Sequence, residues 1–311
     1  MILSHTVVIC SRGRDGVLNS LIRNIEETSS FEEIAVLIVL NGIGESEFLA
    51  QQQELLKVSK GNLTVVSSQP GLVHARNAAL NLVKTDLITF FDDDVALPTN
   101  YFLELDKFMA DRSHVYGCAP RVRGYNPNSS LKHIFPLRSK TREKYFGKLT
   151  KSGLNVWIPD DATSESIRVD WMPGCAMTYR TMQIAGMQFD PALMNGPTKG
   201  YSLGEDVEFS SRVTDLYSIP NLAIDHLYAT SVRDMEKVMA EANGRWLAYL
   251  LRNRKSQVYI KNILARLLLS SLKGLLDDIL KLNYRFTRSS TRISQLKYFL
   301  LELQNPKLES N

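Results

Sequence analysis

Short apolar runs alternate with stretches of helical periodicity through the first 120 residues of the chain. The runs are rich in Val, Ile, Leu and Phe, as is typical of parallel strands buried on both faces. The pattern predicts strands at Thr6–Cys10, Ile34–Leu40, Leu63–Val66, Leu87–Phe91 and Val115–Cys118, with helices at Val17–Glu27, Glu45–Lys57, Val73–Val83 and Tyr101–Ala110. We therefore expect an α/β fold with a mostly parallel, Rossmann-like central sheet flanked by helices.

Ligands of such sheets bind beyond the carboxyl ends of the strands. The loops that follow Cys10, Leu40, Val66 and Phe91 should therefore face one common cleft.

Helical periodicity dominates from Asp234 onward, so we expect a C-terminal helical extension. Its Leu, Ile and Tyr positions are interleaved with Arg and Lys. We expect one apolar side formed by Ile260, Ile263, Leu264, Leu267, Leu268 and Leu275, with Lys261, Arg266 and Lys273 off it. This pattern indicates either a helical cap that packs on the α/β body or peripheral helices that contact an anionic membrane surface. The same apolar side could equally serve a homo-oligomer.

The overall composition is ordinary, but charge is distributed unevenly along the chain. The 311 residues are 44% hydrophobic and 23% charged, which excludes disordered, collagen-like and disulfide-scaffold classes. The net charge of +4 hides an asymmetry: residues 231–311 hold 15 Lys+Arg against 7 Asp+Glu and carry +8, whereas residues 1–230 hold 22 against 26 and carry −4. We expect one domain over residues 1–230, with an acidic balance, and a basic amphipathic helical region over residues 231–311.

The three cysteines are widely spaced and lie among apolar or small neighbours. Cys10, Cys118 and Cys175 therefore suit reduced, buried thiols better than a disulfide framework. The first residues read as a strand and not as a signal peptide, and no apolar run is long enough to span a bilayer. We expect a cytoplasmic protein that can also lie at the inner face of the cell membrane.

Three consecutive carboxylates, Asp92, Asp93 and Asp94, follow a very apolar strand. Their mutual repulsion calls for a cation or for an exposed turn. Asp92 and Asp94 could present oxygens to one Mg²⁺ or Mn²⁺ site, with Asp93 turned away. A solvated turn, or a cap for a helix starting near Thr99, is the alternative.

A second acidic pair, Glu205 and Asp206, opens a predicted helix. Helix capping alone could explain two acids at this position. At a cleft, one acid could instead orient the substrate while the other accepts a proton from a hydroxyl.

Six segments in this order resemble the inverting family 2 glycosyltransferases with a GT-A fold. The resemblance covers about residues 5–230, and the ordered set is more specific than any one part. The segments are Thr6-Val-Val-Ile-Cys-Ser-Arg, Val39-Leu-Asn-Gly, Gly71-Leu-Val-His-Ala-Arg-Asn-Ala-Ala-Leu, Phe91-Asp-Asp-Asp, Met172-Pro-Gly-Cys-Ala-Met and Gly204-Glu-Asp-Val-Glu-Phe.

The resemblance implies a role for each matching residue. It makes Asp206 the catalytic base, with Glu205 in support. It places Asp94 on the metal that bridges the donor diphosphate, with His226 approaching that metal. The residues that it assigns to the nucleotide and donor are Ser11, Arg12, Asn41, Arg76, Asn77, Asp92, Asp93 and Gly174, and it places Cys175 near the acceptor. Trp171 is a further acceptor candidate, because aromatic rings can stack on sugar faces. Asn41 stands where family members commonly have an acid, although its amide can still bond a base edge.

These roles imply a metal-assisted transfer of a sugar from a nucleotide-diphosphate sugar to a hydroxyl acceptor, such as a surface polysaccharide or a lipid-linked glycan. A divalent cation, Mn²⁺ or Mg²⁺, is the implied cofactor, and no nucleic acid partner is expected. Two alternatives stay open: a non-catalytic nucleotide-sugar binding module, and a haloacid-type phosphatase. Ala96 disfavours the phosphatase, which needs Thr or Val at that position.

Overall fold

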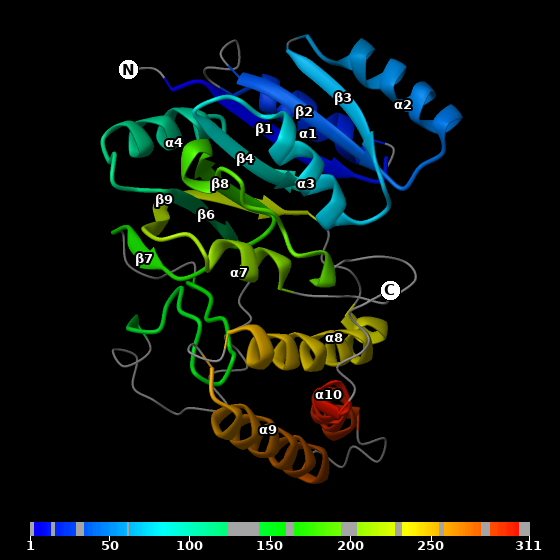
Figure 1. The fold of residues 1–311 in the computed structure, drawn as a ribbon, viewed down its shortest axis with the longest axis vertical. Coiled ribbons are helices and arrows are strands. Elements are labelled where there is room, and N and C mark those ends of the chain that lie inside the picture. The colour runs from blue at the N-terminus through cyan, green and yellow to red at the C-terminus, as the bar shows by residue number, and fades with distance from the viewer. Residues whose placement is uncertain are drawn as a thin grey trace. The chain divides into compact units, whose positions relative to one another are not determined.

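The computed structural model describes residues 3–13, 16–28, 34–60, 62–123, 143–159, 165–193, 204–227, 232–254, 258–280 and 287–304 (Figure 1). The chain forms two compact units. One comprises residues 1–126, 158–194 and 205–228, and the other comprises residues 127–157, 195–204 and 229–311. The domain boundary expected after Thr230 lies outside the described residues, so that division stays a prediction.

The first unit is built on a nine-stranded sheet with the strand order β3-β2-β1-β4-β8-β6-β9-β5, and β7 pairs with β9 beside this path. Its first half is parallel, as the sequence predicts. It consists of β1 (His5–Ser11), β2 (Ile34–Asn41), β3 (Leu63–Ser68) and β4 (Leu87–Asp92).

The second half of the sheet is mixed. It consists of β5 (Val95–Ala96), β6 (Gly117–Arg123), β7 (Ile167–Val169), β8 (Ala176–Arg180) and β9 (Leu216–His226). β8 runs antiparallel to β4 and β6, β9 runs parallel to β6, and β5 and β7 pair antiparallel with β9. The strand expected at Val115–Cys118 is shifted, because Val115 belongs to the preceding loop and the pairing with β9 continues to Arg123.

Helices cover both faces of the parallel strands, which explains why those strands are apolar throughout. Phe90 packs edge-on against Phe189 at 5.7 Å between ring centroids, whereas the next residue, Phe91, packs against Tyr101 on the opposite face at 5.4 Å. The helices of this unit are α1 (Val17–Glu26), α2 (Glu45–Val58), α3 (Leu72–Leu82), α4 (Tyr101–Ala110) and the short α7 (Glu205–Ser210), with 3-10 turns at Thr181–Ile184 and Pro191–Leu193. The helix expected near Thr99 thus begins at Tyr101.

The second unit contains α8 (Val232–Asn253), α9 (Ile260–Leu280) and α10 (Thr287–Gln304), which confirms the expected helical extension. α10 packs on both α8 and α9 (Figure 1). The close approach of α8 and α10 depends on Gly244, because an added Cβ there would lie 2.7 Å from the Gln295 carbonyl oxygen. No helix in the described ranges is long and apolar enough to cross a membrane.

The apolar side expected for α9 is only partly buried. Ile263 and Leu267 are buried, whereas Leu268 and Leu275 are exposed. The apolar residues therefore form two faces of the helix, because the run continues around more of its circumference than one packing partner covers.

Candidate active site

The first group of candidate site residues lies where the short strand β5 pairs with the end of β9. Asp92 ends β4, and β5 begins three residues later and pairs with the end of β9, so that Val95 lies opposite His226. The N–H of Leu227 donates a hydrogen bond to the Asp94 carbonyl oxygen at 2.8 Å. This pairing brings together residues 132 positions apart in the sequence.

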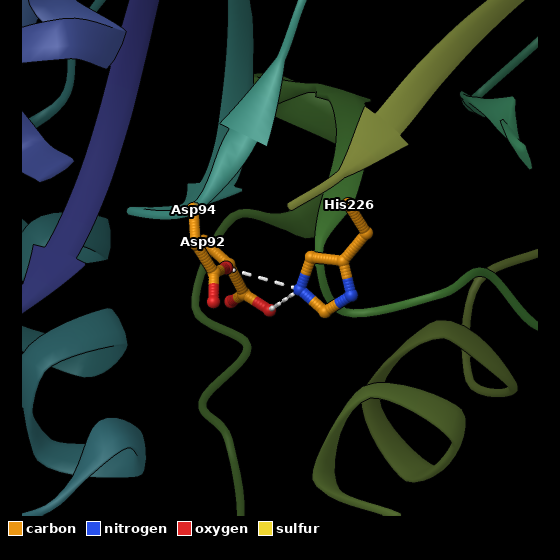
Figure 2. A group of neighbouring side chains, drawn as sticks. All are labelled: Asp92, Asp94 and His226. Atoms are coloured by element: carbon orange, nitrogen blue, oxygen red, sulfur yellow. Dashed lines mark hydrogen bonds and ion pairs between the residues drawn. The ribbon is translucent and has the colours of Figure 1, made fainter. Parts of the chain in front are cut away.

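Asp92, Asp94 and His226 form a group that could hold a metal ion (Figure 2). His226 Nε2 lies 3.0 Å from Asp94 Oδ1 and 3.9 Å from Asp92 Oδ2. One ligand atom from each residue lies within 4.8 Å of the others. Two carboxylate oxygens and one imidazole nitrogen are donors that suit Mn²⁺ or Mg²⁺. The donor set thus fits a divalent cation, and it combines the Asp92 and Asp94 pair expected from their spacing with the His226 expected from the resemblance.

Asp93 points away from this group and belongs to a different polar cluster. Its carboxylate accepts a hydrogen bond of 2.5 Å from the Ser11 hydroxyl, and both side chains are buried. The Asn41 amide donates to the Ser11 carbonyl oxygen at 2.9 Å and accepts from the Gly71 N–H at 3.2 Å. These contacts tie together the ends of β1 and β2 and the start of α3, so Asn41 already uses its amide within the protein.

The second acidic group, at the start of α7, is held by backbone donors. The Asp206 carboxylate accepts one hydrogen bond from the Gly174 N–H and one from the Val207 N–H, each at 2.8 Å. Burial raises the pKa of Asp206, although these donors and the nearby Arg76 oppose the shift. Burial and the neighbouring Asp206 raise the pKa of Glu205 to about 7, against the lowering effect of Arg76. The pair therefore combines a fixed carboxylate with an acid that titrates near neutral pH.

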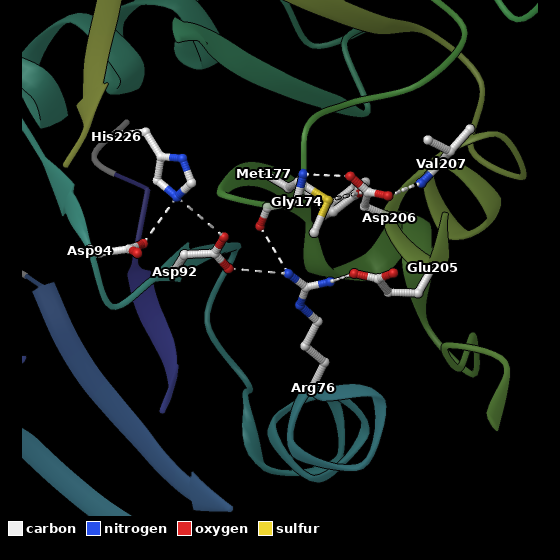
Figure 3. Close-up of polar contacts among 10 residues, drawn as sticks. Arg76, Asp92, Asp94, Gly174, Met177, Glu205, Asp206, Val207 and His226 are labelled. Atoms are coloured by element: carbon white, nitrogen blue, oxygen red, sulfur yellow. Dashed lines mark hydrogen bonds and ion pairs between the residues drawn. The ribbon is translucent and has the colours of Figure 1, made fainter. Parts of the chain in front are cut away.

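Arg76 lies between the two acidic groups and contacts both (Figure 3). Its side chain is 2% exposed and lies 3.5 Å from Asp92 Oδ1 and 3.3 Å from Glu205 Oε1. It also donates to the Gly174 carbonyl oxygen at 2.9 Å. Burial alone would lower the pKa of Arg76, but the two carboxylates outweigh it and raise that pKa. Arg76 thus remains a cation. It links the group that could hold a metal ion to the acidic group at the start of α7.

This bridging role was not predicted, although the sequence carries a signal for it. α3 buries Val73, Arg76 and Ala79, which repeat at helical spacing. A charged residue on a buried helical face requires partners of opposite charge, because an unpaired buried charge is costly.

The backbone of Gly174 passes closely between these groups. A Cβ at this position would lie 3.1 Å from both Arg76 Nη2 and Asp206 Cβ, so a side chain would press on both. The next residue, Cys175, accepts the Asp92 N–H through its carbonyl oxygen at 3.1 Å. Burial raises the pKa of the Cys175 thiol, and all three cysteines are buried and free.

Comparison with known proteins identifies the family. Residues 6–169 match the family described as glycosyl transferase family 2. The chain belongs to this family. The family assignment favours sugar transfer over the haloacid-type phosphatase chemistry considered from the sequence. No match is found among curated proteins.

Solved glycosyltransferase structures share the fold at low identity. The crystal structure of GalNAc-T7 with UDP, GalNAc and Mn²⁺ has a TM-score of 0.59 and 14% identity, over 97% of this chain and 57% of that chain. The mannosyltransferase PcManGT from Pyrobaculum calidifontis, in complex with GDP-Man and Mn²⁺, has a TM-score of 0.59 and 13% identity, over 99% of this chain and 88% of that chain. The present chain thus spans little more than half the length of GalNAc-T7. The GT-A type of α/β fold expected from the sequence is confirmed.

Three further residues were assigned to the site of this family 2 glycosyltransferase from the sequence. Their hydrogen bonds or exposure differ from those of the two acidic groups. The Asn77 amide donates to the Phe189 carbonyl oxygen at 2.9 Å and accepts the Phe189 N–H at 2.7 Å, so it fixes that loop. Trp171 is 4% exposed, which leaves little of its ring available to an acceptor. Arg12 is exposed at the end of β1. Their roles in binding stay predictions.

The raised pKa of Glu205 predicts a pH-dependent stability. The folded state holds this proton more tightly than the unfolded chain, so the stabilisation is present below pH 4.5 and is lost as the pH rises through 7. We expect the free energy of unfolding of the wild type, relative to Glu205→Gln, to fall across this window by about 3 kcal/mol at most. Urea unfolding of both proteins as a function of pH measures this difference. Parallel pH profiles of the unfolding free energy in the two proteins would contradict the raised pKa of Glu205.

Proposed function

We propose that this protein transfers a sugar from a nucleoside diphosphate sugar to an acceptor hydroxyl with inversion at the anomeric carbon. The observation that carries the proposal is the contact of one buried cation, Arg76, with both acidic groups. A single-displacement transferase needs one group for the donor diphosphate and another for the acceptor proton, and here the two lie on either side of the same side chain. Family membership and the ligands UDP and GDP-Man in the similar solved structures support the donor class.

On the donor side, Asp92, Asp94 and His226 would hold Mn²⁺ or Mg²⁺. The bound cation would neutralise the negative charge that develops on the departing diphosphate. Ser11, Asp93 and Asn41 lie at the ends of neighbouring strands of the same sheet edge, where nucleotides bind in open α/β sheets. We assign the nucleoside to this cluster, and Gly174 to the donor sugar.

On the acceptor side, Asp206 would act as the general base. Two backbone N–H groups fix its carboxylate, and its raised pKa strengthens it as a proton acceptor. The acceptor oxygen forms a bond to the anomeric carbon while the bond from that carbon to the diphosphate oxygen breaks. The hydroxyl proton passes to Asp206, and the nucleoside diphosphate leaves with the electron pair. Glu205 supports the base by holding Arg76 in place.

The acceptor we propose is a hydroxyl of a glycan, either in a surface polysaccharide or on a lipid carrier. Free, buried cysteines agree with the reducing compartment in which nucleotide sugars are made. Cys175 and Trp171 are the residues that we predict to lie near the acceptor.

The metal-dependent donor site predicts a thermal shift that one substitution removes. Nucleoside diphosphates screened with Mn²⁺ should raise the melting temperature of the wild type, because a ligand of the folded state stabilises it by mass action. Asp94→Asn should abolish the shift, since it weakens a cation ligand while Leu227 still donates to the backbone carbonyl of residue 94. Asp225→Asn is the matched control, because Asp225 pairs with exposed Arg123 outside the cluster.

Transfer from sugar diphosphates of the nucleoside found in this screen then tests the mechanism. NMR of the first product should show the anomeric configuration opposite to that of the donor. Retention of configuration would overturn the inverting assignment. Metal-dependent binding without turnover on any acceptor or on water would favour the non-catalytic module.

A further inference from the structure

α9 carries apolar residues on two opposite sides. One side packs within its unit and contains Ile263, Leu267 and Gly274, which are all buried. The opposite side, which we call the outer face, spans about 140° of the helix circumference. Its residues are 39% to 80% exposed, and they are Leu268, Leu269, Leu272, Leu275, Leu276, Ile279 and Leu280.

Contacts among the described residues of the second unit account for the burial of one side of α9, but they do not cover its outer face. The Asp278 carboxylate is buried and accepts the N–H of Ser289 at the start of α10 at 2.7 Å. Arg266 is likewise held within the unit, because its Nε donates to the Ser152 carbonyl oxygen at 3.1 Å. Within the described ranges, no element covers the seven residues of the outer face enough to bury them. A continuous apolar face of this size marks an interaction surface.

Charge along α9 is segregated with respect to the outer face. Helical spacing places Lys261 on the same side as the outer face and Lys273 at its edge, whereas Asp277 and Asp278 lie toward the buried side. The described part of α9 therefore has basic but no acidic side chains on or beside the outer face. The surrounding segment, residues 231–311, carries +8.

We propose that the outer face of α9 docks the protein on an anionic lipid bilayer, with the helix lying in the plane of the interface. Apolar side chains enter the boundary between headgroups and acyl chains, and the lysines contact anionic headgroups. A second copy of the chain would bring two surfaces of the same positive sign together in a symmetric contact, which disfavours self-association. An anionic bilayer complements both the apolar face and its charge.

Flotation of the full chain with lipid vesicles tests this inference without donor or metal, so its outcome is independent of the proposed transfer. We expect the wild type to float with phosphatidylcholine vesicles that contain phosphatidylglycerol, and much less with phosphatidylcholine alone. The double variant Leu272→Asn and Leu276→Asn should lower the partition coefficient by about 100-fold, because two apolar side chains no longer leave water. Lys261→Gln should lower it by about fivefold, because it removes one positive charge on the side of the outer face.

The chain offers a matched control for these variants. Leu49 and Leu56 of α2 are 49% and 51% exposed, against 56% and 51% for Leu272 and Leu276. Leu49→Asn with Leu56→Asn should leave flotation unchanged, and melting temperatures confirm that all variants fold. The proposal is overturned if the wild type ignores anionic vesicles or if the α2 variant loses binding equally. It is also overturned if sedimentation without lipid shows a wild-type dimer that the α9 variant dissociates.

Discussion

Asp206→Asn is expected to lower the rate of sugar transfer by about 100- to 10,000-fold, which is the usual contribution of a general base. The substitution keeps the size of the side chain but removes its ability to accept the acceptor proton. The fold should persist, because an asparagine oxygen can still accept one of the two backbone N–H groups that hold Asp206. Metal-dependent binding of the nucleotide should also persist, since the proposed cation ligands are unchanged. Initial rates and calorimetric titration with the nucleotide measure the two effects separately.

A neighbouring acid on the same helix provides the control for this experiment. Glu208 is buried like Glu205, but its carboxylate pairs with Arg212 at 3.1 Å. Glu208→Gln should therefore leave the transfer rate within a few fold of the wild type. Normal turnover by Asp206→Asn, or an equal loss in Glu208→Gln, would show that Asp206 is not the base.

Arg76→Met is expected to cost about 3–5 kcal/mol in the free energy of unfolding and to reduce transfer as well. Removing one partner of a buried ion pair leaves the other charges uncompensated, which is more costly than the pair itself is worth. Asp92 and Glu205 would lose their shared cation, and the Gly174 carbonyl oxygen would lose a donor. Chemical denaturation monitors the stability, and transfer rates with saturating donor monitor the activity.

A second substitution separates charge from packing in this variant. Adding Glu205→Gln to Arg76→Met should restore part of the lost stability, because a neutral amide does not need a cation, and a double-mutant cycle gives the coupling energy. The control is Arg123→Met, which breaks an ion pair whose side chains are 54% and 50% exposed and should change stability by less than about 1 kcal/mol. Additive effects of Arg76→Met and Glu205→Gln would show that the bridge does not exist.

The regular part of the fold could be predicted because it follows local rules. β1, β2, β3 and β4 are apolar runs that the flanking helices bury on both faces, and their positions were predicted to within a few residues. β9 was not predicted, because its sequence has neither a continuous apolar run nor a regular alternation and contains Pro220. The division of the apolar residues of α9 into a buried and an exposed part was not predicted either, since spacing alone does not say how much of a helix its neighbours cover.

The sequence by itself determined the parallel strands, the two acidic groups, the family resemblance and the separation of a basic helical segment from an acidic body. These depend on residue type and on short spacing, which a chain displays directly. The resemblance implied that His226 and Asp94 approach one metal, but only the tertiary structure decided that the antiparallel pairing of β5 with β9 brings them together and that Arg76 joins the two acidic groups. It also showed that Asp93, expected to turn away from the cation, bonds Ser11, and that Asn41 is held within the protein. Such contacts join residues far apart in the chain, and they form because buried charges and polar groups must find partners wherever the fold brings them together.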